Sequence, residues 1–200
     1  NYEALLADPA VEVIHNCTPN ALHYPVNAAA IAKGKHVVSD KPLAMTAAEA
    51  KALRDQAVKA GIVHAVTFNY RGNPLVQQAR LAVARGDIGA PHFVTGQYLQ
   101  DWLLKDTDYS WRLEPEKSGA SSALGDIGSH WCDLAQHVSG LRIVEVLADI
   151  TTVIKQRKKP LGSREAFAAA GADDRVELVD IKVEDLASVL IRFDNGAKGS

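Results

Sequence analysis

The chain has 200 residues, of which 47% are hydrophobic, and it carries a formal net charge of −2 at pH 7. A chain of this length and apolarity can bury a substantial core, as one large domain or two small ones. The near balance of acidic and basic residues argues against a general nucleic-acid or membrane-surface binder, and no apolar run is long enough to span a bilayer.

Strand-like and helix-like segments alternate over the first third of the chain. Strands are expected over residues 11–17, 37–39 and 62–68, and helices over residues 21–33 and 46–60. Thr46 has the hydroxyl of a helix N-cap, and Glu49 follows at the capping-box position. Strands joined by helices of this length imply right-handed crossovers and a parallel sheet. This part is therefore expected to be half of a doubly wound α/β domain.

The tripeptide Asp40-Lys41-Pro42 follows the second of these strands. Ligands of open α/β sheets bind beyond the carboxyl ends of parallel strands. Pro42 favours an extended Lys41, which would hold the ammonium near this crevice, where a lysine can bind a substrate hydroxyl and tune its acidity. From the residues alone, a surface turn with a solvated charge pair is an equally good interpretation.

Longer strands with fewer helices follow after residue 68. Helices are expected over residues 74–85 and 123–138, strands over residues 92–100, 143–154, 176–182 and 186–193, and a loop over residues 155–174. The last two strands are expected to be antiparallel neighbours in one open sheet, as in an α+β domain. The predicted fold class is α/β plus α+β. It comprises the C-terminal part of a doubly wound Rossmann domain (residues 1–68), then an α/β domain with an open, mainly antiparallel sheet (residues 69–200).

The two cysteines, Cys17 and Cys132, lie at the end of an expected strand and within an expected helix. Neither has the spacing of a metal knuckle or a redox motif. Both are expected to be buried free thiols, which suits a reducing cytoplasm.

Four ionisable residues share one face of the helix expected over residues 123–138. Asp126, His130, Asp133 and His137 fall in a stripe about 60° wide if each residue turns the helix by about 100°. Three interpretations remain open: a solvated face with paired charges, a metal site, or an acid/base pair. In the acid/base pair, Asp126 would orient a substrate hydroxyl while His130 takes its proton. No further ligand cluster supports the metal site, and no metal is predicted.

Four segments, in this order and at these separations, resemble the glucose–fructose oxidoreductase / inositol dehydrogenase (Gfo/Idh/MocA) family across nearly the full chain. His15-Asn16-Cys17-Thr18-Pro19-Asn20-Ala21-Leu22-His23 looks like the family's strand and turn beside the cofactor. Gly34-Lys35-His36-Val37-Val38-Ser39-Asp40-Lys41-Pro42 looks like the strand that leads to its Glu-Lys-Pro motif. Trp111-Arg112 resembles a motif of the active-site loop, and Gly125-Asp126-Ile127-Gly128-Ser129-His130 looks like the catalytic Asp-x-x-x-His segment.

The resemblance implies a dinucleotide-binding domain followed by a domain whose open sheet forms homo-oligomer contacts. It also implies hydride transfer between NAD or NADP and a sugar, polyol or inositol-like secondary alcohol. The matching positions make Lys41, Asp126 and His130 the catalytic set. His130 would be the general base for alcohol oxidation, Lys41 would stabilise the alkoxide-like oxygen, and Asp126 would fix an adjacent hydroxyl.

The resemblance also implies a set of cofactor contacts. These are Thr18, Pro19, Asn20, His23, Asp40, Lys41, Asn69, Trp111 and Arg112. Asp40 stands where the family usually has Glu, which shortens its reach by one methylene. Arg71 is a weaker candidate that would serve equally well in an interdomain ion pair, and Trp111 is more typical of packing. Asp133 and His137 are expected to support the site or the structure.

The chain starts within an expected helix and lacks the Gly-rich turn that binds a pyrophosphate, so we expect an internal fragment that by itself binds dinucleotide poorly. The parent protein is expected to be a cytoplasmic enzyme with neither a nucleic-acid nor a membrane partner. The main alternative is a catalytically silent relative that senses a sugar or dinucleotide, or serves as an oligomeric scaffold. A third interpretation is a metal-dependent hydrolase or lyase, which a chelator would inactivate.

Overall fold

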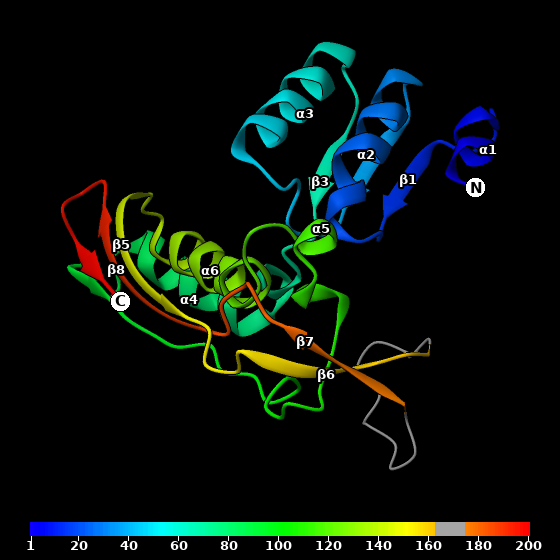
Figure 1. Cartoon of the computed structure of the whole chain (residues 1–200). Helices are drawn as coiled ribbons and strands as arrows, with labels where there is room; N and C mark the ends of the chain where they lie inside the picture. The colour runs from blue at the N-terminus through cyan, green and yellow to red at the C-terminus, as the bar shows by residue number, and fades with distance from the viewer. Residues whose placement is uncertain (163–174) are drawn as a thin grey trace. The chain divides into compact units, whose positions relative to one another are not determined.

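A computed structural model of the chain describes residues 1–162 and 175–200, so the loop expected over 155–174 lies partly outside the described residues. The chain divides into two units (Figure 1). The first comprises Asn1–Phe68 and Glu116–Ala120, and the second comprises Asn69–Pro115 and Ser121–Ser200.

The first unit is built on a parallel sheet of order β1-β2-β3. Its elements are α1 (Tyr2–Ala7), β1 (Val13–Asn16), the 3₁₀ helix η1 (Asn20–Leu22), α2 (His23–Ala32), β2 (His36–Ser39), α3 (Ala47–Ala60), β3 (His64–Val66) and most of α5 (Pro115–Ser118). The alternation β1–α2–β2–α3–β3 confirms the predicted parallel α/β arrangement. In such a sheet all three strands end at the same edge.

Helices α2 and α3 pack side by side over one face of this sheet (Figure 1). The core lies between them and the strands, and is formed by Leu6, Ile14, Ala30, Ile31, Val37, Leu53 and Ala57. Burial of each Leu, Ile or Val side chain contributes about 1.5–3 kcal/mol. The strand side chains alternate between faces, so Val13 and His15 point away from this core and are exposed.

Sequence signals set the bounds of α3. The Thr46 hydroxyl accepts the Glu49 N–H, and the Glu49 carboxylate accepts the Thr46 N–H, which confirms the predicted capping box. Gly61 ends the helix with a φ of 66°, a left-handed conformation that glycine adopts without steric cost.

The second unit has a four-stranded mixed sheet of order β4-β9-β8-β5 and a separate ribbon, β6-β7. Its elements are η2 (Asn69–Gly72), α4 (Pro74–Arg85), β4 (Phe93–Val94), η3 (Trp111–Leu113), the π-helix η4 (Leu124–Gly128), α6 (Ser129–Ser139), β5 (Ile143–Thr151), β6 (Gln156–Pro160), β7 (Val176–Asp180), β8 (Leu186–Phe193) and β9 (Lys198–Gly199). Helix α6 covers one face of the sheet through Trp131 and Ala135, which pack against Ile191 and Phe193. Helix α4 packs against α6.

Several predicted elements of the second unit are wrong in extent or pairing. The strand expected over 92–100 is represented by β4 alone, which pairs with β9. Residues 156–160 form β6 rather than a loop. Strand β7 pairs with β6, and not with β8 as predicted, so the unit has two sheets instead of one. By contrast, α4 and β8 have the predicted bounds.

Both cysteines are free thiols, as predicted, but Cys17 is exposed rather than buried, because it follows the last paired residue of β1, and Cys132 is half-buried. Among the described residues, the longest apolar helical stretches fall short of what is needed to cross a membrane.

Candidate functional site

A buried chain of polar side chains supports the carboxyl ends of β1 and β2. The Asn16 amide donates to Asn27 Oδ1 at 2.8 Å, and the Asn27 amide donates to Ser39 Oγ at 2.8 Å. All three side chains are almost fully buried. Since buried polar groups are costly unless hydrogen-bonded, this satisfied chain fixes the two strand ends against α2.

The turn after β1 is held by hydrogen bonds within the first unit. Thr18 donates both its N–H and its hydroxyl to Asn16 Oδ1, at 3.2 and 2.7 Å. The ring nitrogens of His23 lie 2.8 Å from the Thr18 carbonyl oxygen and 2.6 Å from that of Pro42. His23 is only 1% exposed, so it ties the turn after β1 to the turn after β2 from within the core. Direct contact of His23 with a cofactor stays a prediction.

Pro19 and Asn20 complete this turn. Pro19 precedes η1 in an extended conformation, and the Asn20 amide donates to the Ser118 carbonyl oxygen at 2.9 Å. Both residues are half-buried. Their exposed atoms therefore lie on a rigid turn at the strand ends.

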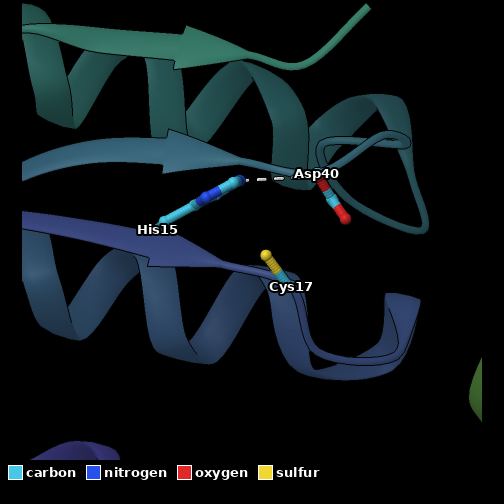
Figure 2. A group of neighbouring side chains, drawn as sticks. All are labelled: His15, Cys17 and Asp40. Atoms are coloured by element: carbon cyan, nitrogen blue, oxygen red, sulfur yellow. Dashed lines mark ion pairs between the residues drawn. The ribbon is translucent and has the colours of Figure 1, made fainter. Parts of the chain in front are cut away.

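Asp40 lies at the end of β2 and is held in place by its neighbours (Figure 2). Its N–H donates to the Asn16 carbonyl oxygen at 2.9 Å, and its Oδ1 accepts the Thr67 hydroxyl at 2.6 Å. His15 Nε2 lies 3.6 Å from the same carboxylate oxygen. Lys41 follows Asp40 directly, is half-buried, and is joined to Pro42 by a cis peptide bond. Residues 18–20, 23, 40 and 41 thus gather at one edge of the sheet.

In the second unit, a buried carboxylate holds the start of the helical segment that carries Asp126. Glu184 Oε1 accepts the Ser121 hydroxyl at 2.7 Å and the N–H groups of Ser122 and Leu124 at 3.0 and 2.9 Å. Anionic acceptors are favoured at the N-terminus of a helix because its first N–H groups have no intrahelical partner. Glu184 comes from the turn before β8, so sequence spacing gave no signal for this contact.

The helix expected over 123–138 begins as the π-helix η4 and becomes α-helical only at Ser129. The 100° spacing used to derive the ionisable stripe is therefore wrong for its first turn. A Cβ added at Gly128 would lie 2.9 Å from Leu124 Cδ2, so a larger residue there would require the Leu124 side chain to shift. π-helical turns are frequent at functional sites.

Asp126, on η4, is paired with an arginine. Arg112 Nε lies 3.1 Å from Asp126 Oδ2. The guanidinium carbon of Arg112 lies 4.6 Å from the ring centroid of Trp111 and 5.4 Å from that of Trp102. The two tryptophans therefore cover the guanidinium, and cation–π attraction holds it in place. This pair links two residues that the sequence motifs had singled out separately.

His130, on α6, is buried against aromatic rings. Its ring centroid lies 4.4 Å from that of Tyr70, and the Tyr98 ring is nearly parallel to it at 6.4 Å. The hydroxyls of Tyr70 and Tyr98 are hydrogen-bonded to each other. This bond and burial raise the pKa of Tyr70 above its ordinary value. The imidazole thus lies among neutral phenols, which sequence analysis did not identify.

Asp133 and His137 lie after His130 on α6, and each contacts a side chain from another segment of the second unit. Arg71 Nε donates to Asp133 Oδ2 at 2.8 Å, and this ion pair lies within the second unit. His137 Nε2 lies 3.3 Å from the Gln77 amide, and burial and the charge of Arg71 lower the pKa of His137. Asn69 is exposed on η2.

These contacts do not support the metal-site interpretation of the helix stripe. In residues 1–162 and 175–200, the potential ligands close enough to share an ion are His15, Cys17 and Asp40, and no stripe residue is among them. Asp126 and Asp133 each face an arginine, which satisfies a carboxylate without a metal ion.

Two family models match the chain. Residues 1–68 match one described as oxidoreductase family, NAD-binding Rossmann fold. Residues 76–200 match one described as the GFO/IDH/MocA C-terminal domain.

Named dehydrogenases and a solved structure are similar to the whole chain. Levoglucosan dehydrogenase of Pseudarthrobacter phenanthrenivorans is 38% identical over 100% of this chain and 51% of that protein. D-xylose 1-dehydrogenase (NADP(+)) 2 of Haloferax volcanii is 35% identical over 98% of this chain and 51% of that protein. A structure of levoglucosan dehydrogenase in complex with NADH and levoglucosan has a TM-score of 0.86 and 35% identity, over 100% of this chain and 49% of that one. The chain thus spans about half the length of the curated relatives it matches.

Proposed function

Because this chain belongs to the GFO/IDH/MocA family of oxidoreductases, we propose that the full-length protein transfers hydride between a nicotinamide dinucleotide and a secondary alcohol of a sugar or polyol. The observation that carries the proposal is the combination of two features in one chain. The NAD-binding unit has Lys41 at a strand end, and the unit matched by the C-terminal domain model has His130 one turn after Asp126.

The strand-end edge of the first unit has donors and acceptors that fit a dinucleotide. Asp40 presents a carboxylate that can accept a ribose hydroxyl, and Thr18, Pro19 and Asn20 form a rigid turn beside it. A bound nicotinamide would accept the hydride from the carbinol carbon during alcohol oxidation. The relatives include one named for NADP(+) and one whose structure contains NADH, so we propose NAD or NADP as the cofactor.

We assign the chemistry on the alcohol to three residues. An imidazole nitrogen of His130 takes the hydroxyl proton, and burial against neutral rings shields this transfer from water. The Lys41 ammonium stabilises the developing negative charge on the oxygen. Asp126, oriented by Arg112, accepts a neighbouring substrate hydroxyl and so positions the reacting carbon. Asn69, Trp111 and Arg112 remain candidates for contact with the cofactor or with the sugar.

Asp126 also supports a proposal for the class of substrate. Asp126 offers a carboxylate, and the relative with the ligand-bound structure is named for levoglucosan, an anhydro sugar. We propose a cyclic sugar or polyol with adjacent hydroxyls, one of which is oxidised while its neighbour is held by Asp126.

The outer face of the four-stranded sheet is the proposed oligomer contact. Leu147 and Leu190 are directly paired across β5 and β8, and are 70% and 59% exposed. Leu186 lies on the same face. Exposed apolar groups of this kind mark interaction surfaces, and we propose that a second copy of the protein covers them, in the cytoplasm.

The test is steady-state oxidation of a panel of sugars and polyols by the full-length protein with NAD⁺ and NADP⁺. The reduced nicotinamide is followed by absorbance. Lys41→Met and His130→Asn proteins run beside it, with circular dichroism to verify folding. Turnover that both variants lose supports the dehydrogenase. Dinucleotide binding without turnover on any polyol would point to a sensor or scaffold, and loss of wild-type turnover on adding a chelator would point to metal chemistry.

A further inference from the structure

Three potential metal ligands of different chemistry meet at the carboxyl ends of β1 and β2. They are His15, Cys17 and Asp40, and one ligand atom of each lies within 4.8 Å of the other two (Figure 2). From this geometry we propose that these residues form a binding site for a thiophilic divalent cation of the Zn²⁺ type, and that an ion bound there excludes the dinucleotide.

The sheet register explains why these three side chains converge. His15 lies on β1, and Cys17 directly follows the last residue of that strand. Asn16 is paired with Ser39, and the Asp40 N–H donates to the Asn16 carbonyl oxygen at 2.9 Å, so Cys17 and Asp40 both follow directly on the last paired residues of the two strands. The backbone pairing at these strand ends therefore brings the three residues together.

The donor set and its dimensions fit a zinc site. Imidazole nitrogen, thiolate sulfur and carboxylate oxygen are the three ligand types that Zn²⁺ binds, at about 2.0–2.3 Å. Ligand atoms of a tetrahedral ion are therefore roughly 3.3–3.8 Å apart. His15 Nε2 and Asp40 Oδ1 already lie 3.6 Å apart. The remaining separations, at most 4.8 Å, need a contraction of about 1 Å, which side-chain rotation of exposed residues can supply.

The residues around the cluster support this assignment. The Thr67 hydroxyl donates to Asp40 Oδ1 at 2.6 Å, as second-layer groups do when they orient a metal-binding carboxylate. Cysteine binds metal ions as the thiolate, so the Cys17 thiol proton would leave when the sulfur binds the ion.

Three protein ligands leave a fourth position open, as in accessible zinc sites. Cys17 directly precedes Thr18, and Asp40 directly precedes Lys41, so the ion would sit on the edge that we assign to the cofactor. An ion held by His15, Cys17 and Asp40 would occupy the space beside Asp40 that the ribose hydroxyl is proposed to enter. The exclusion of the dinucleotide rests on the proposed function, whereas the metal site itself does not.

The experiment uses CoCl₂ as a spectroscopic probe with the full-length protein. A cobalt–thiolate bond gives a near-ultraviolet charge-transfer band, which we expect to saturate at one Co²⁺ per chain and to disappear on adding ZnCl₂. Cys17→Ser is expected to abolish the band, and His15→Gln to weaken Co²⁺ binding by about 10-fold or more. Cys132→Ser is the matched control, because Cys132 is the other free thiol and lies on α6. A band that survives Cys17→Ser, or that Cys132→Ser removes, overturns the site, as does the absence of any band.

NADH is then titrated into the cobalt-loaded protein. Loss of the band in step with NADH binding supports exclusion, and NADH binding that leaves the band intact overturns it. NADH is also titrated into the cobalt-free protein, and no binding there at any concentration keeps the metal site but contradicts the proposed function, on which the exclusion rests. The two proposals therefore fail in distinguishable ways.

Discussion

Arg112 and Asp126 form an ion pair in which each side chain is only about one-fifth exposed, with 3.1 Å between Arg112 Nε and Asp126 Oδ2. The guanidinium is also covered by Trp111 and Trp102. An arginine held in this way fixes the plane of its carboxylate partner, so it determines where the other carboxylate oxygen points. Arg112 is thus a positioning residue for the group that we propose binds a substrate hydroxyl.

The first prediction is that Arg112→Lys lowers kcat/KM for the sugar by about 10- to 100-fold, because a point-like ammonium cannot fix the Asp126 carboxylate. Arg142→Lys is the matched control, since Arg142 forms an exposed pair with Asp194. Equal loss in both variants, or an unchanged kcat/KM for Arg112→Lys, would contradict the positioning role.

The second prediction concerns pH. Its hydrogen bond with Tyr98 and its burial raise the pKa of Tyr70, so this phenol stays protonated throughout the range of about pH 6 to 9. Any rise of kcat/KM for alcohol oxidation in this range must therefore come from another group, and we assign it to loss of a proton by His130.

Tyr70→Phe tests this assignment, because it removes the hydroxyl and keeps the ring against His130. The variant should retain the rise of kcat/KM with pH, even if the rate itself falls. His130→Asn should flatten the profile. A profile that Tyr70→Phe flattens would identify the tyrosine, and not the histidine, as the titrating group.

The third prediction is that Arg71→Ala destabilises the protein by about 1–2 kcal/mol, because it leaves the Asp133 carboxylate without its cation. The carboxylate is 9% exposed, whereas the guanidinium is 48% exposed, so solvent moderates the loss. Arg54→Ala breaks an exposed pair with Asp55 and should destabilise the protein much less. The free energy of unfolding of both variants is measured by urea denaturation. Equal losses of stability would show that the Arg71 pair is no stronger than a surface pair.

The fourth prediction is that Glu184→Ala exposes the start of the helical segment that carries Asp126. Removing Glu184 Oε1 leaves three donors without their acceptor, which costs about 1–3 kcal/mol. Hydrogen exchange should accelerate more at the Ser122 and Leu124 amides than at the other amides of the second unit. Glu177→Ala, at an exposed position of β7, is the control. Unchanged exchange at these two amides would contradict the capping role.

The parts of the fold that local signals determine could be predicted from the sequence. The capping box of Thr46 and Glu49 determines the start of α3, and α4 has the expected bounds, with Asn73 and Gly86 as its caps. The family and the α/β plus α+β fold class, inferred from motif order, are confirmed by the two family models and by the structural similarity.

Contacts between distant segments could not be predicted in the same way. Glu184 caps a helix more than 50 residues earlier in the chain, and Tyr98 meets Tyr70 and His130 through packing that no spacing reveals. The His15, Cys17 and Asp40 cluster was also missed, although the parallel register of the first two strands was a usable signal for it. The pairing of β7 with β6 was also missed, because an alternating pattern shows which residues favour a strand and not which partner pairs with them.

The central claim is hydride transfer from a sugar carbon, and its most direct test is isotopic. The full-length protein is incubated with NAD⁺ or NADP⁺ and the sugar or polyol of the panel that it oxidises fastest, carrying deuterium at its carbinol carbons, and the reduced cofactor is analysed by mass spectrometry. The account predicts one deuterium in each reduced nicotinamide, formed by the wild-type protein and not by His130→Asn. Reduced cofactor without deuterium, or equal formation by the two proteins, would contradict it.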